Sequence, residues 1–464
     1  MNSRCNRFSS PNKNTRTNAN RAPRRGAFLL LFALIALGAA ADLPARKNLR
    51  VWRFYLQPYK NTRVFIDGRP VRPRLIRRDK TQALVSVRHR FAEDSFQVRF
   101  TRPGYATLEK TVRLSTERKR FRSLRLYNLY QLTKKGEHDL GAYWPVGSWP
   151  KSATFLDRDR VVLPLLAGKG KNAGIDVLNI RNGTRVHLRP PRRYARRSGF
   201  VETLVLPEKR EFWVSQMSQS SVHIFDSLTL AYKSTIRLKG RWTKVLLHDP
   251  ARKLVYASNW SSHDISVIDV NRKKELYRLR AGGIPRGMIL SPSGKHMYVA
   301  LFAGYSRGPD GRDRVRKNNI VKIDLKKRKI IKRFGRRGAK RHIVKDGRGR
   351  MYVSDMWYAK IEVYDLKTDR LIKRIPVFYK PNTIVLSPDE KRLYVSCRGP
   401  NHPRGYTRKG LRMGRLYAID LDRLEVSEFW EGGNQPTGLD ISPDGKSLVS
   451  TDFLDNRVRV YTRR

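Results

Sequence analysis

Apolar and polar residues alternate over short stretches along most of the chain, which is typical of β-strands whose two faces meet different surroundings. Turn sequences rich in Ser, Pro, Asp and Gly separate these stretches, as at Ser291-Pro292-Ser293-Gly294. Proline suits the second position of a tight turn, and glycine suits a position with positive φ. The pattern predicts an all-β protein.

One unit of this pattern recurs between Pro150 and the C-terminus. It holds an apolar strand, a turn, a strand such as MYVALF, a loop, a strand ending in VID or VYD, a turn, and a strand leading to Gly and Pro. Four short strands per unit are typical of a β-propeller blade, and the number of units predicts a seven-bladed β-propeller. Aspartates that end the third strands are expected to hold the following turns; they are Asp226, Asp269, Asp324, Asp365 and Asp420.

The last unit, from Ser442 to Arg464, is one strand short. We expect residues near 138–146 to supply the missing outermost strand, because Leu140 and Trp144 keep the alternation and a link-like Gly and Pro follow. Pairing the two chain ends in this way closes the ring and covers edges that would otherwise be open. Residues 124–132 also have the pattern of a strand, so the N-terminal segment supplies either one or two strands to this blade.

The repeats carry a family resemblance. The segments LSPSGKHMYVALF, LSPDEKRLYVSCR and ISPDGKSLVSTDF, each followed by a VxVID-like strand and a GGxP-like link, resemble the YVTN family of seven-bladed propellers. The resemblance extends from Pro150 to the C-terminus and implies an exported or surface protein. Ser or Ala stands where the family has Thr, and the family's Asn is kept only at Asn259.

The region before the repeats, residues 49–129, is also strand-like, and Asp67-Gly68 between two apolar runs predicts a tight hairpin. Together with Gly104-Tyr105, it is similar to PEGA-type β-sandwich modules. This similarity implies an accessory module of the cell envelope that carries no chemistry.

The first 41 residues have the composition of a secretory signal. A basic stretch ends at Arg25, an apolar run covers residues 27–37, and three alanines precede Asp42. An uncleaved anchor is the alternative. The predicted organisation is a signal peptide over residues 1–41, a PEGA-like module over 42–130 and a propeller over 131–464, in a protein exported to the periplasm or the cell surface of a bacterium.

Charge narrows the choice of partners. The chain has 99 Lys and Arg against 39 Asp and Glu, a net charge of +60. Such a field attracts polyanions, so the candidates are lipopolysaccharide, acidic glycan, nucleic acid, an acidic protein or a membrane surface, with no transmembrane span once the signal is removed. The alternative is a basic composition shared by the whole proteome. The lone cysteine of the mature chain, Cys397, is expected to be a small core residue.

Candidate functional residues gather on one face of the predicted ring, where the loops between second and third strands and the links between units open. Two of these loops are long, 22 residues from Tyr298 to Ile320 and from Tyr394 to Leu416, against 9 in most other units. Long loops in compact domains are commonly functional. The predicted ligand-binding residues on this face are Trp149, Arg197, Trp242, Lys244, Trp260, Arg286, Arg312, Arg314, Arg341, His342, Asp355, Trp357, Arg398, Arg404, Arg408 and Arg412.

These residues favour an exported, non-enzymatic binding scaffold whose basic loop face engages a polyanion or an acidic protein. Arg and Lys interleaved with aromatics suit sugars or bases beside charged groups. No cofactor or metal motif is present. One alternative is a lyase or hydrolase acting on an anionic polymer, with His342 and Asp355 in its active site. The other is a surface-layer-like structural protein.

Overall fold

The computed structural model describes residues 49–57, 61–78, 83–90, 95–102, 108–113, 123–124, 129–131, 138–168, 172–194, 198–302, 306–307, 313–314, 319–410 and 412–463. The predicted signal peptide and Gly104-Tyr105 lie outside these residues. Strands dominate the described part of the chain, and no α-helix occurs in it, which confirms the all-β prediction. Within the same residues, no helix is long and apolar enough to cross a membrane.

Two sheets form the N-terminal region. The first has the order β4-β5-β1-β8, with β9 also paired to β1, and the second has the order β3-β2-β6-β7. The strands of the first are β1 (Leu49–Gln57), β4 (Arg74–Arg78), β5 (Ala83–Arg90), β8 (Ser123–Leu124) and β9 (Leu129–Gln131). Those of the second are β2 (Arg63–Ile66), β3 (Arg69–Val71), β6 (Ser95–Thr101) and β7 (Leu108–Arg113).

Alternate side chains of both sheets meet in one hydrophobic core. Trp52 of β1 packs against Phe54 at 4.1 Å between ring centroids and edge-on against Phe96 of β6 at 5.1 Å. The predicted hairpin joins β2 and β3, and its Asp67 and Gly68 have φ of 47° and 77°. Positive φ at both central residues is what a type I′ hairpin turn requires, so the hairpin prediction is confirmed.

The following strands form consecutive four-stranded antiparallel sheets. They are β11 (Thr154–Phe155), β12 (Arg160–Pro164), β13 (Ile175–Asn179) and β14 (Arg185–Leu188); β15 (Phe200–Leu206), β16 (Glu211–Gln216), β17 (Ser221–Asp226) and β18 (Tyr232–Arg237); β19 (Thr243–Asp249), β20 (Leu254–Asn259), β21 (Asp264–Asp269) and β22 (Lys274–Arg280); β23 (Pro285–Leu290), β24 (His296–Leu301), β27 (Ile320–Asp324) and β28 (Lys329–Phe334); β29 (Lys340–Lys345), β30 (Arg350–Asp355), β31 (Lys360–Asp365) and β32 (Leu371–Pro376); β33 (Pro381–Leu386), β34 (Arg392–Cys397), β35 (Arg415–Asp420) and β36 (Glu425–Glu431).

Smaller elements lie between these strands. The loop from β24 to β27 contains the paired strands β25 (Ser306–Arg307) and β26 (Asp313–Arg314). Two short 3-10 turns, η3 (Pro207–Lys209) and η4 (Met217–Gln219), flank β16.

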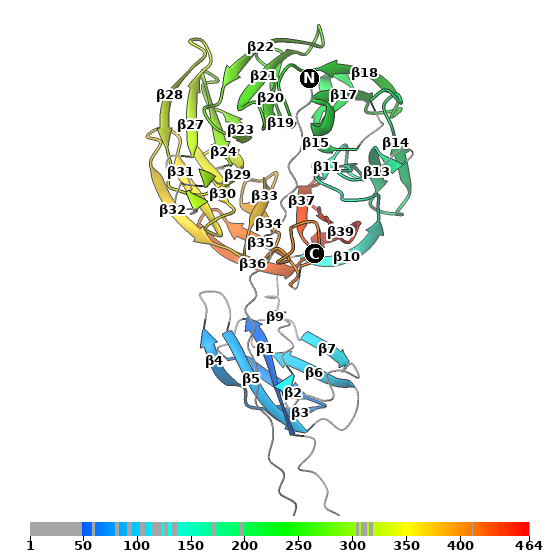
Figure 1. Cartoon of the computed structure of the whole chain (residues 1–464), viewed down its shortest axis with the longest axis vertical. Helices are drawn as coiled ribbons and strands as arrows, with labels where there is room; N and C mark the ends of the chain where they lie inside the picture. The colour runs from blue at the N-terminus through cyan, green and yellow to red at the C-terminus, as the bar shows by residue number, and fades with distance from the viewer. Residues whose placement is uncertain are drawn as a thin grey trace, which may run out of the picture. The chain divides into compact units, whose positions relative to one another are not determined.

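The first strands of the sheets form a ring. Each contacts the first strand of the next sheet, in the order β11, β15, β19, β23, β29, β33 and β37 (Pro436–Ile441), and β37 contacts β11. The sheets therefore stand around a central axis, as Figure 1 shows, with their first strands inside. This arrangement defines a β-propeller.

Both ends of the chain build the last sheet, whose order is β10-β39-β38-β37. The outermost strand β10 (His138–Pro145) runs antiparallel to β39 (Arg457–Arg463), which in turn pairs with β38 (Ser447–Asp452). The predicted closing strand is thus confirmed. The other predicted strand, residues 124–132, does not join this sheet. Its strand β9 pairs with β1 of the N-terminal region instead.

A β-bulge interrupts the first strand of nearly every sheet at the same place. The ladder to the second strand skips two residues in β15, β19, β23, β29, β33 and β37. A hydroxyl on the second strand fills the gap: Ser354 Oγ accepts the bulge N–H of His342 at 2.9 Å and donates to the carbonyl of Asn382 in the next sheet at 3.2 Å. Ser215 Oγ bridges Glu202 and Lys244 in the same way.

The predicted turn aspartates hold their turns. The carboxylates of Asp226, Asp269, Asp324, Asp365 and Asp420 accept backbone N–H groups two or three residues further along the chain. Between the sheets, alternate apolar side chains pack face to face, as where Tyr256 and Val267 meet Met297 and Val299. Each fully buried aliphatic side chain contributes about 1.5–3 kcal/mol.

We expect Ser354→Ala to lower the free energy of unfolding by about 1–3 kcal/mol, because it leaves a buried N–H and a buried carbonyl without partners. Chemical denaturation measures this difference. The control is Ser261→Ala, which removes a hydroxyl from an exposed loop residue. A loss for Ser354→Ala no larger than for the control would contradict the bridging role.

Candidate functional site

The bulges determine which side chains reach the channel that the first strands surround. The first bulge residue is Lys244 in β19, Arg286 in β23 and Arg341 in β29, and Lys151, just before β11, takes the corresponding place in its sheet. The second bulge residue of β15 is Glu202. Bulges re-aim side chains and often lie beside functional sites.

Four of these residues, Lys151, Glu202, Lys244 and Arg286, form what we call the channel cluster. Lys151 interacts electrostatically with Glu202, with Arg286 and with Arg398 of a further sheet, so side chains from separate parts of the ring converge. Lys244 is 5% exposed and Arg286 only 3%. Among the described residues, Nε and Nη1 of Arg286 have no hydrogen-bond partner.

Burial and mutual repulsion shift the pKa values of the cluster. Burial lowers the pKa of Lys151 and of Lys244 well below its usual value, and the neighbouring cations lower both further. Burial lowers the pKa of Arg286 to about 10 and raises the pKa of Glu202 to about 7, although nearby cations oppose the latter shift. One carboxyl with a raised pKa therefore faces three basic side chains with lowered pKa values.

Aromatic rings line the same part of the molecule. Lys244 Nζ lies 3.8 Å from the ring centroid of Trp260, and the Arg286 guanidinium lies 5.4 Å from it. Trp260 also packs edge-on against Trp242 and against Phe302. These cation–π contacts replace part of the hydration that the buried cations lose, and each contributes on the order of 1–2 kcal/mol.

The link residues that precede the ring strands are held in an unusual backbone conformation. Trp149 and Trp242 have φ of 58° and 62°, and φ is also positive, at 58°, in both Lys380 and Gln435. Left-handed φ is rare for residues with a side chain, and it costs about 1–3 kcal/mol in strained sites. Trp149 keeps this geometry through its N–H, which donates to Asn456 Oδ1 at 2.9 Å.

Arg398 connects this region to the second long loop. Its guanidinium donates to Gln435 Oε1 and lies 5.5 Å from the ring centroid of Tyr406, while Nε has no partner among the described residues. Burial lowers the pKa of Arg398 to about 10. Gln435 in turn donates to the Tyr406 carbonyl at 2.6 Å, so the loop is tied to the next sheet.

The other predicted residues fall into distinct settings. Arg404 and Arg408 are exposed in the second long loop, and Arg412 is half-buried in it. Trp357 is 44% exposed in the β30–β31 loop. Arg341 donates to Asn382 of the neighbouring sheet. Arg197 and Arg312 lie outside the described residues, as does the side chain of Arg314.

Asp355 has a structural position. It is fully buried, forms a 2.7 Å ion pair with the equally buried Lys340, and accepts the backbone N–H of Trp357 at 3.0 Å. His342 instead receives the Ile384 N–H at 3.5 Å, and burial, helped by Arg286, lowers its pKa to about 4. The two residues of the enzyme alternative thus engage different partners.

Sequence reasoning missed three charged residues of the channel: Lys151, Glu202 and Asp440. Burial raises the pKa of Asp440 to about 7, and Glu202 raises it further. The missed signal is positional, since Lys151, Lys244, Arg286 and Arg341 occupy corresponding places in the first, third, fourth and fifth units.

Comparison with solved structures supports the β-propeller fold class. The chain resembles a solved structure of Kuenenia stuttgartiensis hydrazine synthase with a TM-score of 0.55 at 17% identity, covering 71% of this chain and 98% of that one. At this identity the likeness concerns the fold alone, and it fits an all-β propeller. No family model matches the chain.

Sequence relatives define the family. The chain is 45% identical over 423 residues to antigen Lp49 of Leptospira interrogans serovar copenhageni, covering 90% of this chain and 89% of the relative. It therefore belongs to the family of antigen Lp49. The uncharacterized protein YncE of Salmonella typhi is 22% identical over 180 residues, which are 39% of this chain and 48% of that protein.

Because Lys340 also binds Glu362 at 2.7 Å, it neutralises two buried carboxylates. We expect Lys340→Met to lower the free energy of unfolding by about 3–5 kcal/mol, since both carboxylates lose their buried cation. Thermal or chemical unfolding measures the loss. Lys329→Met, at an exposed position of β28, serves as the matched control, and equal stability of the two variants would show that the buried pair is unimportant.

The raised pKa of Glu202 predicts a pH dependence of stability. Between about pH 4.5 and pH 7 the unfolded chain ionises this carboxyl while the folded chain keeps it protonated, so folding stability falls as pH rises through this window. We expect the stability of the wild type relative to Glu202→Gln to fall by about 1–3 kcal/mol across it. Urea unfolding at several pH values measures the difference, and a difference independent of pH would refute the shift.

Proposed function

We propose that the chain is an exported, non-enzymatic binding protein of the cell envelope whose channel cluster binds an acidic group of a polyanion. The observation that carries this proposal is Arg286, a buried guanidinium that lies beside two further basic side chains and has two nitrogens that lack partners among the described residues. A buried cation without a partner destabilises a fold, so its presence is best explained by a ligand that completes it.

The ligand class follows from the donors. Lysine and arginine side chains donate strongly to carboxylate, sulfate and phosphate groups, and the adjoining indoles offer flat apolar surfaces. An elongated acidic polymer would place one charged group in the channel cluster and others near the exposed Arg404 and Arg408. An acidic glycan, lipopolysaccharide and nucleic acid share this chemistry, and a protein partner with an acidic segment would bind through the same contacts.

The architecture and location are also part of the proposal. The consecutive sheets favour a seven-bladed propeller of the YVTN type, and the two N-terminal sheets favour a PEGA-like β-sandwich. The signal-like first 41 residues and a relative named as an antigen support export and exposure at the cell surface.

We expect Arg286→Met to weaken polyanion binding while raising the free energy of unfolding, because it removes a buried charge that Glu202 and the Trp260 ring compensate only in part. Binding of a sulfated heparin oligosaccharide, lipopolysaccharide and single-stranded DNA is measured across a salt series, and stability is measured without ligand. A specific site keeps one probe bound at salt concentrations that release the others.

The matched control is Lys326→Met, which removes one exposed positive charge from the turn between β27 and β28. Lys326→Met should bind the probe that remains bound at higher salt as tightly as the wild type does. If Arg286→Met binds every probe as the wild type does, or if it destabilises the fold, the channel cluster is a structural feature and the proposal fails.

A further inference from the structure

A second basic cavity lies outside the channel cluster, between the sheet that ends in β28 and the sheet that begins with β29. Its volume is about 460 Å³, within the range of roughly 300–1,000 Å³ that small-molecule sites occupy. Its lining residues come from the link between the two sheets, from the β30–β31 loop and from β31 and β32; they are Gly335, Arg336, Arg337, Tyr358, Lys360, Glu362 and Arg374.

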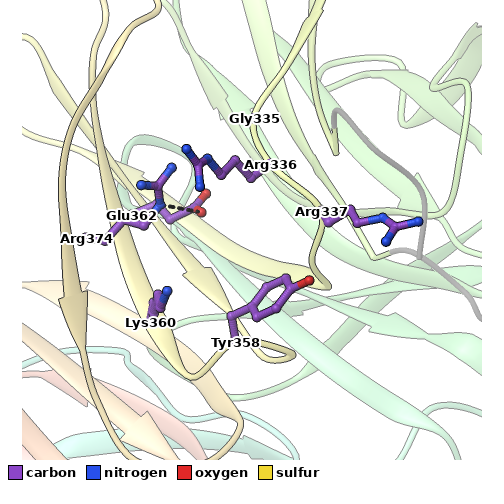
Figure 2. Close-up of a pocket in the computed structure, with 7 residues that line it drawn as sticks. All are labelled: Gly335, Arg336, Arg337, Tyr358, Lys360, Glu362 and Arg374. Carbon is purple, nitrogen blue, oxygen red and sulfur yellow. Dashed lines mark ion pairs between the residues drawn. The ribbon is translucent and has the colours of Figure 1, made fainter. Parts of the chain in front are cut away.

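Figure 2 shows Arg336 and Arg374 directed toward the carboxylate of Glu362, with Lys360 close by and Arg337 pointing elsewhere. Glu362 Oε2 is already engaged, since it binds Lys340 Nζ at 2.7 Å and the Tyr364 hydroxyl at 2.6 Å. Its other oxygen, Oε1, is 3.6 Å from Arg374 Nε, which is too long for a strong hydrogen bond.

Charge is unbalanced in this cavity. Asp355 and Glu362 together offset Lys340 and Arg374. In the described part of the chain, Arg336, Arg337 and Lys360 have no acidic partner, so the lining carries an excess of positive charge. A ligand with one acidic group would be held by these cations through charge-assisted hydrogen bonds.

The cavity also offers an acceptor and an aromatic surface. Glu362 Oε1 is placed to accept a hydroxyl group, and Tyr358 is 44% exposed at the rim beside the equally exposed Trp357. A ligand that fits must therefore carry an acid, hydroxyl donors and a flat apolar face. A sugar acid has all three.

We propose that this cavity is a binding site for an acidic sugar, one residue of a glycan that carries a carboxylate, sulfate or phosphate. Arg336 and Lys360 bind the acidic group, Glu362 accepts a sugar hydroxyl, and Tyr358 covers one face of the ring. The site is separate from the channel cluster and does not depend on it.

Calorimetric titration with a hyaluronan hexasaccharide tests the site. Chitohexaose is the uncharged counterpart of this ligand, and a six-nucleotide single-stranded DNA tests whether the cavity binds nucleic acid instead. We expect Arg336→Gln/Lys360→Gln to weaken binding of the acidic hexasaccharide by about tenfold to a hundredfold, and Tyr358→Ala to weaken it by about tenfold. Arg336, Lys360 and Tyr358 are not fully buried, so these variants should fold.

The matched control is Lys326→Gln/Lys327→Gln, which removes the same charge from an exposed turn and should bind as the wild type does. The cavity variants should lose the same affinity in an Arg286→Met background as in the wild type, which separates failure of this site from failure of the channel cluster. The proposal is overturned if the cavity variants bind like the control, if chitohexaose binds as tightly as the acidic sugar, or if the hexanucleotide binds more tightly and loses affinity in the same variants.

Discussion

The bridge from a second-strand hydroxyl to the first-strand bulge determines the geometry of the ring. At Ser354 one oxygen accepts an N–H from its own sheet and donates to the carbonyl of the next, so the same group sets both the bulge and the distance between neighbouring sheets. Where β24 has Ala300 in place of the hydroxyl, Gly287 stands at the bulge, and a Cβ there would lie 2.8 Å from Ile343 N. The backbones of the two neighbouring sheets therefore approach each other closely at that point.

The same bulges explain how a fold made only of strands carries a dense group of charges. An unbroken strand alternates its side chains between two faces, whereas a bulge leaves an extra residue aimed into the channel. Lys244 and Arg286 sit at such positions, with their charge only partly compensated by indole rings and by Glu202. Ring closure by β10 helps to hold these repelling groups together, because the sheets cannot move apart unless that pairing breaks.

The strands, the turn aspartates and the closing strand were predictable from the sequence, because each depends on a local pattern of a few residues. The bulges were not, since they depend on a ladder between two strands, and hence Lys151 and Glu202 were missed. Asp355 is the converse case, because its position is structural. It was predicted as a ligand-binding residue of the loop face, but the structure buries it against Lys340, which comes from a different strand of the same sheet.

A uniformly basic composition does not account for where the charges lie. Exposed cations such as Lys326 and Lys327 are hydrated and need no partner, so composition alone is enough to explain them. Arg286 is different, because in the described part of the chain two nitrogens of its buried guanidinium lack hydrogen-bond partners and Glu202 offsets its charge only in part. An uncharged residue at the bulge would pack there without that penalty. Incomplete compensation of a buried charge is therefore a feature of the channel that a basic composition alone does not explain, and it is the reason for proposing the ligand site there and not on the outer surface of the sheets.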